Sequence, residues 1–156
     1  INPFIPKPFT PFQWLPMADE KWVKDAMKTI RKGLAPYRSI RIIAESPKSA
    51  YVQGVLARGD RRVARALHRA FLAGGAKSFK RALKEEGLSF ADFLQVRHAE
   101  DAVFPWDVLD MGFPKQYLYR ELQRAAALQY TKPCFSGCTR CGVCDTMEER
   151  HVSAQT

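Results

Sequence analysis

The feature that most constrains this chain is a group of cysteines near its C-terminal end. All the cysteines of the 156-residue chain fall within eleven residues, at the spacing C-x3-C-x2-C-x2-C: Cys134, Cys138, Cys141 and Cys144. None remains elsewhere to form a disulfide, whereas a secreted disulfide scaffold distributes its cysteines along the chain. The pattern therefore predicts one metal centre bound by four thiolates, in a protein of the reducing cytoplasm.

The spacing also bears on the identity of the metal. A zinc ribbon or finger usually takes its ligands as two pairs separated by roughly a dozen residues or more. No such gap separates these cysteines, so one continuous loop supplies all the thiolates, as is common around iron–sulfur clusters. Gly137 and Gly142 allow the backbone to turn closely around such a body. We predict an iron–sulfur cluster, with zinc as the alternative.

The first three cysteines by themselves have the C-x3-C-x2-C spacing of a radical SAM cluster. Two features argue against that role. Arg140 stands where that motif usually has an aromatic residue, and Cys144 follows at once and would fill the iron corner that S-adenosylmethionine needs. A cluster closed by four thiolates suits electron transfer or a structural role rather than direct substrate activation.

The net charge of the chain does not by itself identify a binding partner. The formal net charge is +9, with Lys and Arg spread along the chain and mixed with acidic residues. A polyanion partner such as RNA is one interpretation, and a solvated surface is the favoured one, because a binding footprint is usually more clustered. No apolar stretch approaches the ~20 residues of a membrane-spanning helix, so no membrane partner is expected.

The positions of prolines, glycines and helix-capping residues along the chain predict a mostly α protein of the α+β class. Residues 1–17 are rich in proline and aromatic residues and should run extended over a hydrophobic surface, with at most a short strand at 2–5. A helical region with one strand near 39–45 is expected over 18–130, followed by a cysteine metal-binding loop at 131–145 and a disordered tail at 146–156. Helix starts are predicted at Asp19, Ser46 with Pro47, Asp60, Ser89 with Asp92, and Pro114.

Two further groups of residues are candidate sites. The turn containing Arg58, Asp60, Arg61 and Arg62 precedes a predicted helix and forms a candidate site for a carboxylate or phosphate, although a helix cap with surface charge is slightly favoured. Asp107 and Asp110 lie three residues apart and form a candidate acid–base or ligand pair. Capping a helix and pairing with Arg or Lys is the more ordinary use of those two carboxylates.

Four segments of the chain together resemble the C-terminal part of a family of radical SAM proteins with a cobalamin-binding domain, which are Fe–S oxidoreductase-like and poorly characterised. The segments cover most of the chain in order: NPFIPKPFTPFQW at 2–14, RGDRR at 58–62, PWD and DMG at 105–112, and CTRCGVC at 138–144. The resemblance implies that residues 1–17 hold the last strand of a radical SAM barrel. It also implies that the barrel and a cobalamin-binding domain precede Ile1 in the same polypeptide.

The leading hypothesis is therefore a C-terminal fragment of a radical SAM Fe–S protein that carries an auxiliary cluster or structural metal. By the resemblance, S-adenosylmethionine and cobalamin belong to the parent protein, and the fragment alone is not expected to be catalytic. The alternative is a small basic metal-binding module that binds RNA or a protein partner without chemistry of its own.

Overall fold

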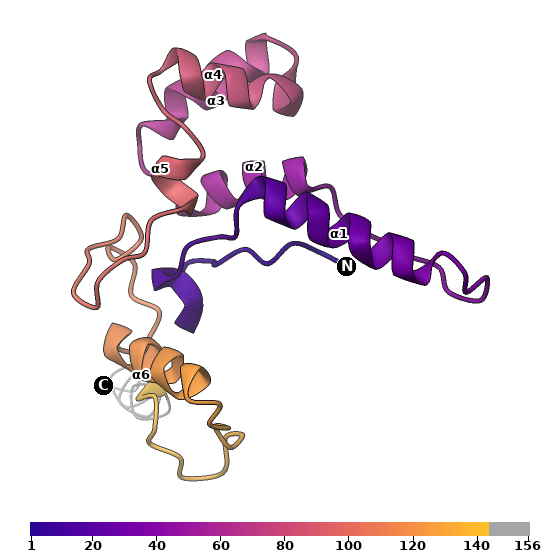
Figure 1. Cartoon of the computed structure of the whole chain (residues 1–156). Helices are drawn as coiled ribbons and strands as arrows, with labels where there is room; N and C mark the ends of the chain where they lie inside the picture. The colour runs from indigo at the N-terminus through magenta and orange to yellow at the C-terminus, as the bar shows by residue number, and fades with distance from the viewer. Residues whose placement is uncertain (144–156) are drawn as a thin grey trace. The chain divides into compact units, whose positions relative to one another are not determined.

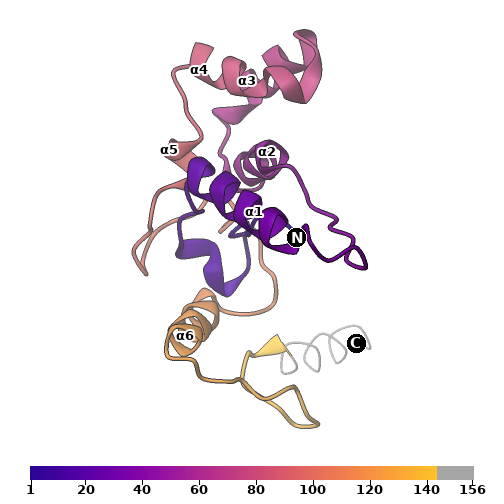
Figure 2. The same cartoon turned by 45° about the vertical axis from the view of Figure 1, so that its right-hand side comes forward.

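The computed structural model describes residues 1–143, so Cys144 and the predicted tail at 146–156 lie outside the described residues. Figures 1 and 2 show helices joined by irregular segments, without a strand in the described part of the chain. The elements are the 3₁₀ helices η1 (Pro11–Trp14) and η2 (Gly75–Ser78) and the α-helices α1 (Glu20–Leu34), α2 (Pro47–Arg58), α3 (Val63–Leu72), α4 (Phe79–Glu85), α5 (Ala91–Leu94) and α6 (Lys115–Ala126).

Local signals in the sequence account for most helix starts. The Asp19 carboxylate accepts hydrogen bonds from the backbone N–H of Lys21 at 2.8 Å and of Trp22 at 3.1 Å, which confirms it as the N-cap of α1. Pro47 occupies the first turn of α2 as predicted, although Ser46 makes no side-chain capping bond. Before α5, the Ser89 backbone N–H donates to Asp92 Oδ2 at 2.6 Å, which is one of the two bonds of a capping box, although the N-cap of the helix is Phe90 and has no side-chain cap.

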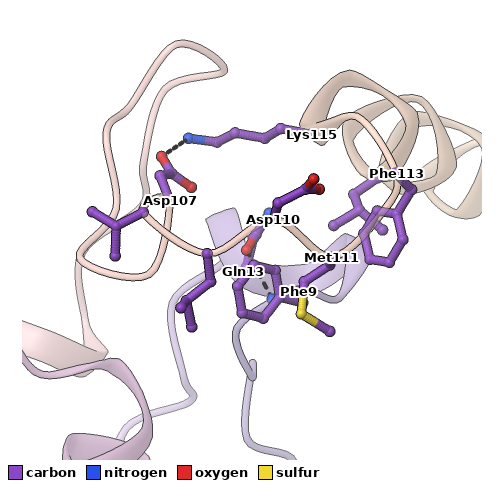
Figure 3. Close-up of a pocket in the computed structure, with 10 residues that line it drawn as sticks. Phe9, Gln13, Asp107, Asp110, Met111, Phe113 and Lys115 are labelled. Carbon is purple, nitrogen blue, oxygen red and sulfur yellow. Dashed lines mark hydrogen bonds and ion pairs between the residues drawn. The ribbon is translucent and has the colours of Figure 1, made fainter. Parts of the chain in front are cut away.

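The chain divides into two compact units. The first comprises residues 1–8 and 14–99, and the second comprises residues 9–13 and the chain from residue 100 onward. Within the second unit, the Trp106 indole N–H donates to Gln13 Oε1 at 2.8 Å, and the Phe104 and Trp106 rings stack with centroids 4.7 Å apart. Lys115 at the start of α6 pairs with Asp107, as Figure 3 shows.

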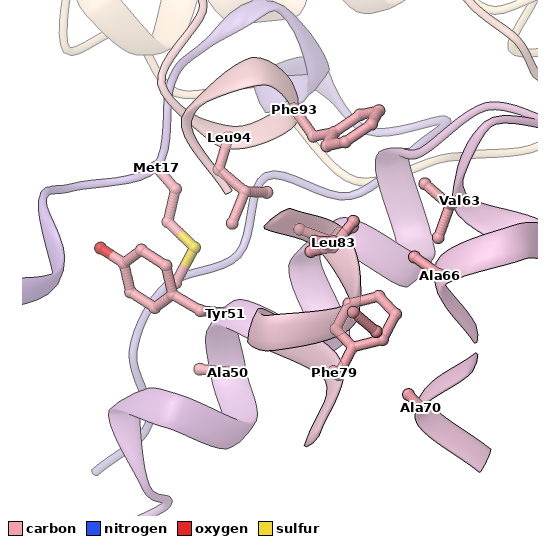
Figure 4. Packing of buried hydrophobic residues seen from close by; sticks show 12 residues of the cluster. Met17, Ala50, Tyr51, Val63, Ala66, Ala70, Phe79, Leu83, Phe93 and Leu94 are labelled. Atoms are coloured by element: carbon pink, nitrogen blue, oxygen red, sulfur yellow. The ribbon is translucent and has the colours of Figure 1, made fainter. Parts of the chain in front are cut away.

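The first unit contains a continuous hydrophobic core, part of which is shown in Figure 4. Helices α2, α3, α4 and α5 supply most of it, and α3 lies beside α4 in both general views. Gly54 of α2 permits the close approach of α5, because a Cβ there would stand 2.9 Å from Leu94 Cδ2. The core residues are Met17, Ala50, Tyr51, Val55, Val63, Ala66, Ala70, Phe79, Ala82, Leu83, Phe93 and Leu94.

The predicted strands are wrong, and with them the α+β class and the barrel-type strand. Residues 39–45 form turns and irregular chain, as do residues 2–5. A strand needs a neighbour along its length, and the backbone pairing of this segment involves the single residue Ile1, which donates to Ile43 O at 2.6 Å and accepts from Glu45 N at 3.1 Å. The side chains of Ile40 and Ile43 remain 47% and 75% exposed, so no core fixes the segment as a strand.

The proline-rich start lies partly on the first unit's core, as its composition suggests. Ile5 packs against the core cluster and Trp14 is buried. Phe4, by contrast, is an exposed side chain rather than a packing anchor. No helix in residues 1–143 is long and apolar enough to cross a membrane.

Candidate metal centre

The segment that leads into the cysteines is fixed to the end of α6. The helix ends with a Schellman motif, in which the Gln129 N–H donates to Arg124 O at 2.9 Å and the Leu128 N–H donates to Ala125 O at 3.1 Å. The Arg124 guanidinium then donates to Tyr130 O at 2.8 Å and to Thr131 Oγ1 at 3.0 Å. These bonds hold residues 130 and 131 against the helix and set where the loop begins.

The loop itself turns at glycines, as its sequence predicts. Gly137 and Gly142 have φ values of 77° and 80°, in the left-handed region that L side chains rarely adopt. The Cys138 N–H donates to Phe135 O at 3.1 Å, so Gly137 is the third residue of a β-turn. A positive φ at that position is what a type II turn requires. The turn connects Cys134 to Cys138.

Arg140 organises the same loop from within. Its guanidinium donates to Lys132 O at 2.7 Å and to Pro133 O at 3.2 Å, and Nη2 lies 3.5 Å from the sulfur of Cys138. The backbone N–H of Arg140, followed by its side chain, lowers the pKa of the Cys138 thiol by hydrogen bonding. A thiol with a lowered pKa is the better nucleophile and metal ligand, because the thiolate is the form that binds.

The three described thiols differ in exposure. Cys138 is buried, Cys141 is half-buried and Cys134 is exposed. Burial raises the pKa of Tyr117 in α6, and the charges of Glu121, Cys141 and Cys134 add to that rise, so these sulfurs share the surroundings of one phenol. Thiolates in one loop fit a soft metal or an iron–sulfur cluster by their donor chemistry.

The arrangement of these thiols is not that of a closed site. Within residues 1–143 no three His, Cys, Asp or Glu side chains come together as a ligand set. Cys144, the fourth predicted ligand, lies outside the described residues. The donor chemistry of the loop thus fits the predicted metal, and the ligand geometry stays a prediction.

A cationic pocket of about 530 Å³ lies beside this loop. Its cations are accompanied by aromatic rings and by a single carboxylate, that of Glu121. Arg124 and Arg140 are already bonded to the backbone, so Arg120 and Lys132 are the cations left to face a ligand. The pocket is lined by Tyr117, Arg120, Glu121, Arg124, Tyr130, Thr131, Lys132, Phe135 and Arg140.

The Arg58–Arg62 turn separates into two parts with different surroundings. The Arg58 side chain is buried and donates to the carbonyl oxygens of Pro6, Leu15 and Phe93, each at 3.1 Å. Burial lowers its pKa, and its Nη2 has no partner within the described residues. Arg58 therefore ties the proline-rich segment to α5 and does not face solvent.

The rest of that turn is at the surface. Asp60 pairs with Arg62 at 2.8 Å, and this side-chain bond lowers the pKa of Asp60. Arg61 and Arg62 line a pocket of about 370 Å³ together with Arg65, Glu86 and Leu88. Anion binding at this turn stays a prediction for Arg61 and Arg62.

Asp107 pairs with a lysine, as the sequence favoured, but neither Asp107 nor Asp110 caps the final helix, whose N-cap is Pro114. Asp107 Oδ2 accepts from the Phe104 N–H at 2.9 Å and pairs with Lys115, and Asp110 Oδ1 accepts from the Gly112 N–H at 2.8 Å. Both nevertheless line one pocket (Figure 3). Sequence reasoning missed Gln13 and Arg140 as organising residues, because their partners are set by turns and by distant segments.

Comparison of the whole chain with protein families, characterised proteins and solved structures gives no match. The geometry and chemistry of the loop itself must therefore support any functional assignment.

Proposed function

We propose that residues 131–145 bind one metal centre through Cys134, Cys138, Cys141 and Cys144, and that the centre is an iron–sulfur cluster rather than zinc. The observation that supports this most strongly is the Cys138 turn. Its glycine has the left-handed φ that a tight loop needs, and Arg140 holds the adjacent backbone while favouring the Cys138 thiolate. When bound, a cluster with four thiolate ligands supplies electron transfer or structural stability.

We further propose that the chain is the C-terminal, cluster-bearing part of a radical SAM protein of the cytoplasm. The four resembling segments and the clustering of all the cysteines support this proposal. In it, the barrel, S-adenosylmethionine and cobalamin belong to the upstream part of the polypeptide. The site at Cys134–Cys144 is then auxiliary or structural and does not cleave S-adenosylmethionine.

The test is anaerobic reconstitution of the chain with ferrous iron and sulfide. We expect a broad absorption near ~400 nm, as for thiolate-bound iron–sulfur clusters, and loss of it in each Cys→Ser variant. Thr139→Ala, an exposed position in the same loop, is the matched control and should retain the absorption. The cluster-loaded chain should also leave S-adenosylmethionine intact under reducing conditions.

A colourless chain that binds one zinc ion would contradict the iron–sulfur assignment and retain the four-thiolate site. Normal metal loading in all four Cys→Ser variants would contradict the site altogether. Cleavage of S-adenosylmethionine by the chain alone would contradict the auxiliary role.

The second candidate function, supported by the cationic pocket beside the loop, is RNA binding by a small metal-binding module. Arg120 and Lys132 offer charge, and Tyr117, Tyr130 and Phe135 offer rings on which bases stack. Binding of single-stranded RNA that weakens steeply with salt would support it. Arg120→Gln with Lys132→Gln should lower that affinity, whereas Lys28→Gln with Lys32→Gln on α1 is a charge-matched control.

A further inference from the structure

The second unit contains a pocket of about 420 Å³ that neither the metal site nor the cationic pocket uses. Small-molecule sites usually have volumes of about 300–1,000 Å³, mostly apolar walls and a few polar groups. All the residues that line this pocket belong to the second unit. Figure 3 shows Asp107, Asp110 and Lys115 around it, together with Gln13, Phe9, Met111 and Phe113.

Gln13 is the buried polar residue of the pocket. Its side chain is 1% exposed, and Oε1 accepts from the Phe9 N–H at 3.1 Å and from the Trp106 indole N–H at 2.8 Å. Both partners can only donate, so the oxygen of the Gln13 amide must face them. The Nε2 end then turns away from them. Gln13 thus ties the Phe9 backbone to the Trp106 ring at the buried end of the pocket.

Lys115 is not available to bind an anion. Its ammonium donates to Ala102 O and to Asp107, and it lies 4.4 Å from the centroid of the Phe104 ring. Three donors are the full capacity of a lysine side chain, and these contacts surround the ammonium. Asp107 in turn is neutralised by Lys115, so this pair adds little net charge to the pocket.

Asp110 is the one charged residue of the pocket lining that is not neutralised by another lining residue. One carboxylate oxygen accepts from the Gly112 N–H at 2.8 Å, which fixes the side chain, and no cation within residues 1–143 forms an ion pair with it. The pocket therefore carries an uncompensated negative charge even though the chain as a whole has a formal charge of +9. Such a charge attracts a cation and repels carboxylates and phosphates.

The apolar wall of the pocket is large and open. Val108, Leu109 and Met111 are 85%, 59% and 49% exposed, and the half-buried Phe9 and Phe113 rings continue the wall. Phe9 has a φ of 55°, a strained conformation for an L residue with a bulky side chain. Such strain collects at binding sites, where neighbouring contacts hold it. Here the bond from the Phe9 N–H to Gln13 is one of those contacts.

We propose that this pocket binds a small aromatic amine. The protonated amine pairs with the Asp110 carboxylate, and the flat body packs on Phe9, Met111 and Phe113. This site is independent of the metal centre, because none of its residues lies in the cysteine loop.

The test uses L-phenylalaninamide, which has an ammonium group and an aromatic ring. Binding to the whole chain is followed by ¹H–¹⁵N spectra, with shifts expected at the Trp106 indole N–H, the Gln13 side-chain amide and residues 107–113. Phenylacetate, which has the ring and the opposite charge, should bind at least about tenfold more weakly, as expected for the loss of a charge-assisted contact.

The key variant is Asp110→Asn, which retains an oxygen for the Gly112 N–H and removes the charge. It should weaken phenylalaninamide binding about tenfold or more, whereas Asp101→Asn, an exposed residue outside the pocket, should not change it. Unchanged binding in Asp110→Asn, equal binding of phenylacetate, or spectral shifts located elsewhere would each overturn the proposal.

Discussion

The two units of the chain place their apolar side chains differently. In the first, Tyr51, Val55, Leu83 and Leu94 are at most 1% exposed and belong to one cluster formed by four helices. In the second, Val103, Val108 and Leu109 are exposed by more than half, and the buried side chains among its described residues are Gln13, Phe104, Trp106, Leu118 and Cys138. The first unit is thus held mainly by side-chain packing.

The second unit depends more on polar side chains that bind the backbone. Gln13, Arg124 and Arg140 each bond to main-chain or indole groups. Hydrogen bonds contribute about 0.5–1.5 kcal/mol each, against several kcal/mol for a buried leucine. The candidate metal centre and the pocket around Gln13 thus lie in the less densely packed unit, as is usual for segments that bind ligands, whereas the candidate anion site at Arg61 and Arg62 lies in the first unit.

The largest expected effect comes from truncating the packed core. Leu94→Ala should destabilise the first unit by about 2–5 kcal/mol, because the fully buried side chain leaves a cavity against Gly54. Leu109→Ala in the second unit should change stability by less than about 0.5 kcal/mol, since that leucine is largely exposed. Denaturant unfolding combined with residue-resolved amide exchange measures both. Equal losses would remove the proposed difference between the units.

The next effect tests whether polar bonding also matters in the first unit. Arg58→Leu leaves the carbonyls of Pro6, Leu15 and Phe93 without their donor, and we expect a loss of about 3 kcal/mol. Arg61→Leu, at an exposed position of the same turn, should have little effect. The same unfolding assay serves here. A neutral Arg58→Leu would mean that packing alone holds the proline-rich segment.

A smaller effect should depend on pH. Burial raises the pKa of Tyr51, whose hydroxyl donates to Ala18 O, to about 12. The folded state therefore holds this proton to a higher pH than the unfolded state, whose tyrosine titrates near ~10. The stabilisation is complete below that pH and is lost as pH rises toward 12, by at most about 1.4 kcal/mol per pH unit.

The measurement is the free energy of unfolding of the chain and of Tyr51→Phe between pH 9 and pH 12, expressed as a difference so that other titrating groups cancel, with the slope expected above about pH 10. A difference that stays constant across this range would show that Tyr51 titrates normally in the folded chain.

The smallest effect concerns the entry to the cysteine loop. Leu128 has a φ of 55° and is 95% exposed, so it carries the strain of the Schellman position without packing in return. Leu128→Gly should stabilise α6 by about 1 kcal/mol. Leu128→Ala, which retains a Cβ, is the matched control and should not. Amide exchange at residues 115–126 reports the change, and an equal gain in both variants would mean that φ is not the cause.

Local physical chemistry in the sequence determined the helix starts and the glycine turns. Asp19, Pro47 and the Ser89–Asp92 pair act on the few residues that follow them, so their effects can be predicted without the fold. Gly137 and Gly142 likewise satisfy a requirement of the turns in which they stand. The thiol-rich composition of the loop is equally local, which is why the metal prediction rests on the sequence.

Tertiary structure decided which apolar faces are buried and which polar groups meet. On α3 the four-residue repeat Val63, Leu67, Phe71 does not mark the core face, because Leu67 and Phe71 are exposed while Ala66 and Ala70 pack inward. The small side chains of Ala66 and Ala70 allow α4 to pack closely on α3. The sequence of α3 alone does not show that another helix packs on this face. Residues 39–45 show the same limit, since a strand depends on a neighbour that only the fold can supply.

The cysteine loop depends both on local sequence and on tertiary contacts. Its glycine turns were predictable from the sequence, and its metal ligands stay a prediction, whereas the contacts of Arg140 with Lys132, Pro133 and Cys138 depend on how the loop folds back on itself. The pairing of Gln13 with Trp106 spans most of the chain, so no local pattern encodes it. The spacing of the cysteines in the sequence predicts thiolate chemistry for this loop. Long-range packing decided which polar side chains bond to one another within the fold.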